Sequence, residues 1–152
     1  HRLSLFNQYL MSDSVSIDDI SLMFDDLFID REYEDFNEAL DDLVSKYKLY
    51  GVNINVTGLL SSDKEKSLVL FEIIRESVTN AINHAGSKNI NVFINESSFD
   101  YEMIINNDGV KPKKKIVEGE GIKGMKRKVY SLGGVIDISS RDGFVLKVRI
   151  KK

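Results

Sequence analysis

The stretch SDKEKSLVLFEIIRESVTNAINHAG, residues 62–86, decides the fold of this chain. Apolar residues recur along it at the three- and four-residue spacing of a helix that buries one face. Ser62 is the expected N-cap, and Gly86 is the expected end. We therefore predict a helix over residues 62–85, with a buried face made of Leu70, Ile73, Ile74, Val78, Ala81 and Ile82.

A second face of this helix carries polar groups at four-residue steps: Glu72, Glu76, Asn80 and His84. A solvated surface position is enough to explain Glu72. Asparagine is poorly favoured inside a helix, yet Asn80 and Asn83 crowd one turn with His84. A carboxylate one turn before a carboxamide on a rigid helix can hold a hydrated Mg²⁺ and a water. Taken alone, the pattern leaves both a solvated face and such a site open.

Alternating residues and turn signals place further elements around this helix. Asp35 is the expected N-cap of a helix over 35–49, and Gly51 its end. Residues 106–121 are expected to be a loop, and 123–132 a short basic helix. Strands are predicted over 52–56, 90–94, 101–105, 135–139 and 144–150, the last two joined by a turn at 141–143. This order predicts an α+β fold in two layers, a mixed and mostly antiparallel sheet with helices on one face.

Composition sets the class of protein. With 152 residues, 42% hydrophobic and 30% charged, the chain has the size and composition of one globular domain with a short appendage. The absence of cysteine excludes disulfides, thiolate zinc sites and cysteine nucleophiles. Residues 1–60 carry 4 basic and 12 acidic residues, whereas residues 61–152 carry 17 and 12. The basic part suits a nucleic acid or a phosphate-bearing small molecule.

Two more motifs lie in the basic part. Asn106-Asn107-Asp108-Gly109 follows a predicted strand and is either a turn or a site where Asp108 accepts a hydrogen bond from an exocyclic amine. The segment GEGIKGM, residues 119–125, opens the basic helix, and glycines there let backbone N–H groups approach a phosphate. It does not follow the first strand of a βαβ unit, so it is no Rossmann fingerprint, and the Walker pattern is absent.

The order and spacing of these motifs resemble the ATP-binding domain shared by histidine kinases, type II topoisomerases, Hsp90 and MutL, the GHKL type. More closely, the chain is similar to the catalytic domain of two-component sensor histidine kinases that partner NarL-type response regulators. Its Asn-box ends in His84-Ala85, the segment between Gly109 and Gly119 is short, and the glycine motif runs into Leu132-Gly133-Gly134. The resemblance covers about residues 35–150. It implies a domain at 31–152, preceded at 1–30 by a remnant of the helical dimerisation region, with helical stripes over 2–12 and 17–29.

The resemblance also implies roles for individual residues, with ATP and Mg²⁺ as cofactors. Glu76 would polarise or deprotonate the attacking histidine or an ordered water, Asn80 would coordinate Mg²⁺, and Asp108 would bond the adenine amino group. The glycines would bring backbone to the phosphates. The implied nucleotide-binding set is Asn80, Asn83, His84, Asp108, Gly109, Gly119, Gly121, Ile122, Lys123, Gly124 and Met125.

The chain departs from the family pattern at three places. Relatives often carry Lys or Arg where this chain has Asn83, and usually Thr where it has Phe144. His1-Arg2-Leu3-Ser4 matches the tail of the phosphoacceptor motif, which places the acceptor histidine just before residue 1. The alternatives are that His1 itself is the acceptor, although no acidic residue follows it, or that His1 is a tag remnant.

The implied function is transfer of the γ-phosphoryl of ATP to a histidine, for relay to an aspartate of a response regulator receiver domain. A serine-kinase relative is a variant of this class. The resemblance further implies a homodimer in the full-length protein and a cytoplasmic position, with the parent anchored in the bacterial plasma membrane through upstream segments. A degenerate, non-catalytic interaction module is the alternative. A nucleic-acid-binding module leaves the Asn-box unexplained, and no aromatics interleave the lysines.

Overall fold

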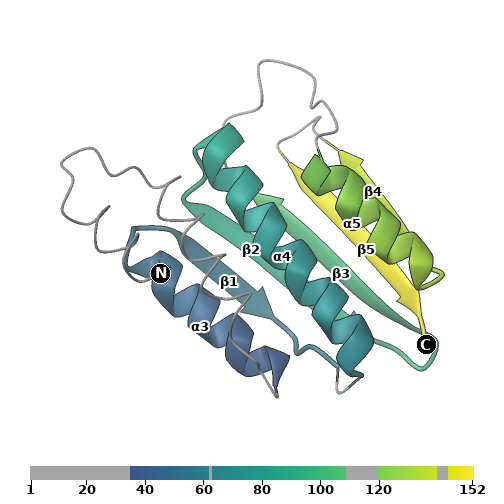
Figure 1. Cartoon of the computed structure of the whole chain (residues 1–152). Helices are drawn as coiled ribbons and strands as arrows, with labels where there is room; N and C mark the ends of the chain where they lie inside the picture. The colour runs from purple at the N-terminus through teal and green to yellow at the C-terminus, as the bar shows by residue number, and fades with distance from the viewer. Residues whose placement is uncertain (1–34, 62, 109–119, 140–143) are drawn as a thin grey trace, which may run out of the picture. The chain divides into compact units, whose positions relative to one another are not determined.

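The computed structural model describes residues 35–61, 63–108, 120–139 and 144–152. Their elements follow the predicted order of helix, strand, helix, two strands, helix and two strands (Figure 1). Predictions for residues 1–34, 109–119 and 140–143 lie outside the described residues, so the division at residue 30 stays a prediction. The elements are α3 (Phe36–Lys48), β1 (Asn53–Thr57), α4 (Lys64–Ala85), β2 (Asn89–Glu96), β3 (Asp100–Asn107), α5 (Glu120–Ser131), β4 (Val135–Ser139) and β5 (Val145–Lys151).

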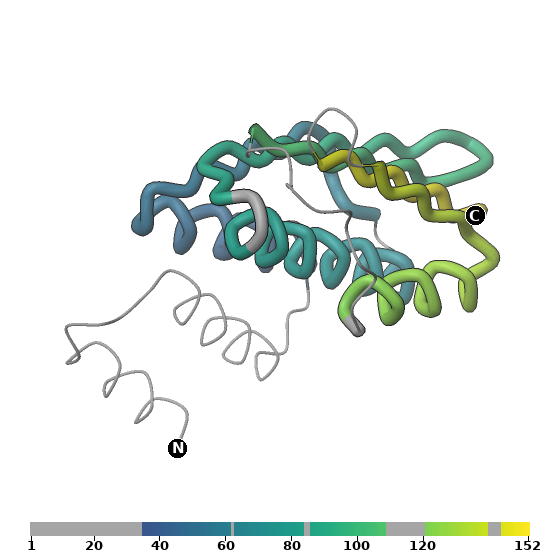
Figure 2. Tube along the Cα trace, turned by 90° about the horizontal axis from the view of Figure 1, so that it is seen from above, coloured from purple at the N-terminus to yellow at the C-terminus, as the bar shows by residue number. Residues whose placement is uncertain are grey.

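The five strands form one mixed sheet in the order β1-β2-β3-β5-β4. Strands β1 and β2 are parallel and are joined by α4, whereas every other pair is antiparallel. The three helices of the described residues lie on one face of the sheet (Figure 2), with α3 over β1, α4 over the centre and α5 beside β4. The predicted two-layer α+β fold is therefore confirmed.

The core lies between the sheet and α4, and strand alternation decides its membership. The predicted apolar face of α4 is buried throughout, from Leu70 and Ile73 at 0% exposure to Ile82 at 8%. Every second residue of the strands points toward the helices. These buried strand residues include Ile90, Val92, Met103, Ile105, Leu146, Val148 and Ile150. The other face of the sheet carries an asparagine ladder, in which Asn55 donates to Asn91 and Asn91 to Asn106.

Three helix ends test the capping predictions. Asp35 is the N-cap of α3, as predicted, and its Oδ1 accepts from the N–H of Asn37 at 2.8 Å. Gly86 ends α4 in the left-handed conformation at a φ of 58°, which also agrees. The N-cap prediction for α4 is wrong: the cap is Asp63, not Ser62, and it accepts from the N–H of Lys66 at 3.2 Å. A carboxylate also interacts favourably with the positive end of the helix dipole.

The predicted start of the last helix is wrong by three residues. Helix α5 begins at Glu120, so Gly121 lies inside the helix rather than in the loop predicted before it, and Gly124 is helical as predicted. Glycine disfavours a helix by only about 1 kcal/mol relative to alanine. Burial of the apolar side chains of Ile122, Met125 and Val129 against the core outweighs that cost.

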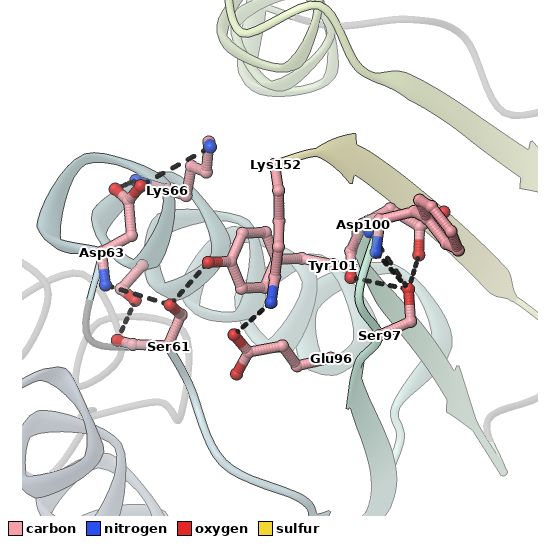
Figure 3. A network of polar contacts seen from close by, with 10 residues as sticks. Ser61, Asp63, Lys66, Glu96, Ser97, Asp100, Tyr101 and Lys152 are labelled. Carbon is pink, nitrogen blue, oxygen red and sulfur yellow. Dashed lines mark hydrogen bonds and ion pairs between the residues drawn. The ribbon is translucent and has the colours of Figure 1, made fainter.

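A polar network fixes the end of the sheet where β3 begins (Figure 3). Ser61 donates to the Tyr101 hydroxyl oxygen at 2.9 Å, and the ammonium groups of Lys66 and Lys152 lie 5.5 and 5.3 Å from the centre of the Tyr101 ring. Lys152 also pairs with Glu96 at 2.9 Å. These contacts tie the start of α4 to β2, to β3 and to Lys152, the residue that follows β5. The polar groups of the candidate site belong to the opposite end of β3.

Candidate functional site

Helix α4 carries the two central groups of the predicted site. Glu76 and Asn80 are one turn apart, and both are half-buried. The Glu76 carboxylate lies against Gly121 in the first turn of α5, so closely that a Cβ atom on Gly121 would overlap Oε1 of Glu76. The structure thus brings together a predicted catalytic carboxylate and a glycine of the predicted phosphate-binding motif.

An ion pair one turn before Glu76 holds the two helices together. Lys128 of α5 donates to Oε2 of Glu72 at 2.5 Å, and the Glu72 side chain is 25% exposed. Glu72, which was interpreted as a solvated residue, is thus partly exposed and also pairs with a residue of α5. No local sequence pattern predicts this pair, which joins residues 56 positions apart.

The other members of the predicted nucleotide-binding set divide by burial. Ile122 and Met125 are core residues, at 8% and 4% exposure. Lys123 and Asn83 are exposed, and Gly124 is half-buried. Gly109 and Gly119, and the side chain of His84, lie outside the described residues. Their predicted roles, like those of Glu76 and Asn80, stay predictions.

The end of β3 presents neighbouring polar residues to different sides of the sheet. Asp108 folds back onto the start of β2, where its carboxylate accepts from the backbone N–H of Lys88 at 3.2 Å and of Asn89 at 2.9 Å, and from Nδ2 of Asn89 at 2.8 Å. These hydrogen bonds, the one from the Asn89 side chain above all, hold the pKa of Asp108 below its ordinary value. Asp108 therefore caps the β2–β3 pair in this structure.

Asn107 is the residue at this strand end that the sequence reasoning did not single out. It pairs with the buried Ile90 and continues the buried series of Tyr101, Met103 and Ile105, so it faces the helices. Its Nδ2 atom is buried. Asn106 faces the uncovered side, where it accepts from Asn91 at 3.0 Å. The alternation along β3 was the signal that could have separated these residues.

Phe144 lies beside Asn107 on the helix-covered face. The β3–β5 register pairs Asn106 with Val145, and its next step sets Asn107 opposite Phe144. Phe144 is 7% exposed and shares its face with Leu146. Where relatives usually carry threonine, this chain therefore has a buried aromatic residue at the position that the register sets opposite Asn107.

The described residues contain neither a metal-binding cluster nor a membrane-spanning helix. In the parts of the chain that the structure describes, no group of three His, Cys, Asp or Glu side chains could hold a metal ion. A magnesium ion here would need phosphate and water for most of its ligands, as Mg²⁺ does in nucleotide sites. None of the helices among these residues is both long enough and apolar enough to span a membrane.

Solved structures share this architecture. The histidine kinase domain of the blue-light activated histidine kinase EL346 from Erythrobacter litoralis matches with a TM-score of 0.63 at 16% identity, over 92% of this chain and 75% of that one. The chain has the fold of histidine kinase domains. The ATP-binding domain of PrrB from Mycobacterium tuberculosis matches with a TM-score of 0.55 at 17% identity, over 77% of this chain and 93% of that one.

A third structure, the histidine kinase AdeS of Acinetobacter baumannii, matches with a TM-score of 0.58 at 16% identity, over 97% of this chain and 82% of that one. No family model and no curated protein matches the sequence. The histidine kinase ATP-binding fold is thus common to the chain and these proteins. The NarL-partner subfamily stays a prediction from the motifs.

Proposed function

We propose that this chain is the ATP-binding catalytic core of a two-component sensor histidine kinase of the NarL-partner subfamily. It transfers the γ-phosphoryl of ATP to a histidine, for relay to an aspartate of a response regulator receiver domain. One observation carries the proposal: the Glu76 carboxylate, one turn before Asn80, lies against Gly121 in the first turn of α5. A base, a metal-binding amide and a glycine-rich helix start therefore come together on a fold that known histidine kinases share.

The described residues fit Mg²⁺ held together with a nucleotide. Mg²⁺ prefers oxygen ligands and keeps several waters, so one protein oxygen is enough when phosphates supply others. The side-chain carbonyl of Asn80, half-buried on α4, is the ligand that we assign. When bound, the ion neutralises charge on the phosphates during transfer.

The remaining residues position the phosphates and the attacking group. The first N–H groups of α5 have no partner within the helix, and its N-terminus favours anions. Exposed Lys123 lies in the same turn and adds positive charge. Glu76 polarises the attacking histidine or an ordered water.

The wider context belongs to the same proposal. The acceptor histidine lies just upstream of residue 1 in the parent protein, which is a homodimer. The catalytic core is cytoplasmic, and the parent is anchored in the plasma membrane by upstream segments. The partner is a receiver domain, and no nucleic acid is bound.

Phosphorylation of the parent protein tests this function. We would incubate it with Mg²⁺ and ATP labelled at the γ-phosphate, and measure label that is lost in acid but kept in base, as expected for phosphohistidine. Glu76→Gln should slow labelling by about 10²–10⁴-fold while nucleotide still binds. Glu102→Gln on the uncovered face of β3 is the matched control and should label normally. An unlabelled parent protein, or equal labelling of Glu76→Gln, would contradict the proposal.

A non-catalytic interaction module is the second candidate. The buried Phe144 beside Asn107 favours it, because an aromatic ring stands where relatives place a hydroxyl. Such a module would bind its protein partner without nucleotide. Loss of partner binding on removal of ATP would therefore count against it.

A further inference from the structure

We propose that Asn107, rather than Asp108, contacts the purine base, and that the site therefore accepts a 6-oxo purine nucleotide as well as a 6-amino one. This inference rests on the proposed function, since it concerns the base of the same nucleotide.

The direction of each side chain decides between the two residues. Asn107 follows Tyr101, Met103 and Ile105 on the face of β3 that the helices cover, the face that also bears Glu76 and Asn80 through α4. A nucleotide whose phosphates lie at the start of α5 and beside Asn80 has its base on this side of the sheet.

Asp108 is engaged elsewhere. Its two carboxylate oxygens receive three hydrogen bonds of 2.8–3.2 Å from Lys88 and Asn89, at the start of β2. Asn89 belongs to the uncovered face, where it also accepts from Asn53 at 3.3 Å. Turning Asp108 toward a base would break these bonds and leave two backbone N–H groups without their acceptor.

An amide and a carboxylate select different bases. A carboxylate only accepts hydrogen bonds, so it suits the 6-amino group of adenine and repels a 6-oxo group. The amide of Asn107 carries an acceptor and a donor, and a half-turn about its Cβ–Cγ bond exchanges them with little change in shape. It can therefore pair with N6–H and N1 of adenine, or with O6 and N1–H of a 6-oxo purine.

Phe144 does not distinguish a 6-amino purine from a 6-oxo purine. Phe144 is buried, and extending the β3–β5 register by one residue sets it opposite Asn107, where its ring offers contact area without a hydrogen-bonding group. With an amide and an aromatic ring in place, discrimination at position 6 of the purine is weak.

The affinities of the chain for ATP and inosine triphosphate, each with Mg²⁺, test this inference, because the two differ at position 6. We expect the unaltered chain to bind both within about 5-fold. Asn107→Asp should raise the ratio of the inosine triphosphate to the ATP dissociation constant by about 10-fold or more, the size of one bidentate base contact. Asn106→Asp, one residue away on the opposite face, is the matched control and should leave the ratio unchanged.

The possible failures can be told apart. If the unaltered chain binds ATP but does not bind inosine triphosphate, this inference alone is overturned. That measurement needs no variant. A changed ratio in Asp108→Asn but not in Asn107→Asp, with both variants folded by circular dichroism, would assign the base to Asp108. Binding of neither nucleotide would overturn the proposed function, and this inference with it.

Discussion

The carboxylate of Glu76 on α4 lies in contact with Gly121 on α5, a position where any larger residue would overlap it. The two residues are 45 positions apart in the sequence, and the Glu72–Lys128 ion pair joins the same two helices one turn earlier on α4. The missing side chain of Gly121 therefore lets α5 approach the Glu76 carboxylate in its present position.

Gly121→Ala should displace Glu76 and slow phosphoryl transfer. The new methyl group overlaps Oε1, and the flexible side chain of Glu76 will move to relieve the overlap. A displacement of about 1 Å at a catalytic group can cost about 100-fold in rate. Labelling kinetics of the parent protein measure this effect, with nucleotide affinity measured in parallel.

Gly124→Ala is the control for Gly121→Ala, because it places an alanine in α5 without affecting the contact between Glu76 and position 121. A Cβ atom at Gly124 meets only the end of the Arg127 side chain, at 3.9 Å. The variant should gain up to about 1 kcal/mol of stability from helix propensity. Thermal unfolding of both variants gives the comparison. A rate for Gly121→Ala equal to that of the unaltered protein would contradict the assigned position of Glu76.

Two buried serines of α4 form a matched pair for stability. Ser67 and Ser77 are both 0% exposed. Ser67 donates to the carbonyl of Ser61 at 2.5 Å, whereas the Ser77 hydroxyl has no hydrogen-bond partner among the described residues. Removing an unpartnered buried hydroxyl is favourable, and removing a bonded one is costly. We expect Ser77→Ala to raise the melting temperature by about 2–4 °C and Ser67→Ala to lower it by about as much. If both variants changed the melting temperature by the same amount and in the same direction, the different hydrogen bonding of Ser67 and Ser77 would be contradicted.

The hydrogen bonds to Asp108 predict how stability depends on pH. They hold its pKa in the folded protein below the ordinary value of 3.8, so the charged form stabilises the fold. The contribution is complete above pH of about 4 and is lost as the pH falls through the folded pKa. Asp108→Asn should therefore melt a few degrees lower at pH 7, roughly the effect of one hydrogen bond.

The same difference should shrink as the pH falls below about 4, because protonation then weakens the acceptor in the unaltered chain as well. Thermal melts from pH 7 to pH 2 measure it. Asp137→Asn on β4 controls for the loss of one exposed negative charge. A melting difference that stays constant over this range would contradict the role of Asp108 as a charged cap.

Local patterns predicted most of the fold. Gly86 and Asp35 end their helices as expected because capping depends on the residue itself and on the nearest backbone groups. The strands followed from alternation, since one face of the sheet is buried. The start of α5 was mispredicted, because glycines suggested a loop, and the packing of Ile122 and Met125 that favours a helix is tertiary.

The candidate site was less accessible from sequence. Motif order selected Glu76 and Asn80, but the orientation of Asn107 and Asp108 depends on strand register, which adjacency in a motif does not reveal. The Glu72–Lys128 pair joins two helices that only the folded sheet brings together. Neither relationship has a local signal.

Calorimetric titration with a non-hydrolysable ATP analogue, with and without Mg²⁺, tests most directly whether this chain binds a nucleotide. We expect binding that Mg²⁺ strengthens, and an Asn80→Ala variant in which this strengthening is lost. Asn95→Ala, exposed on the uncovered face of β2, should bind like the unaltered chain. Absence of binding at millimolar nucleotide would contradict the kinase function and favour the interaction module.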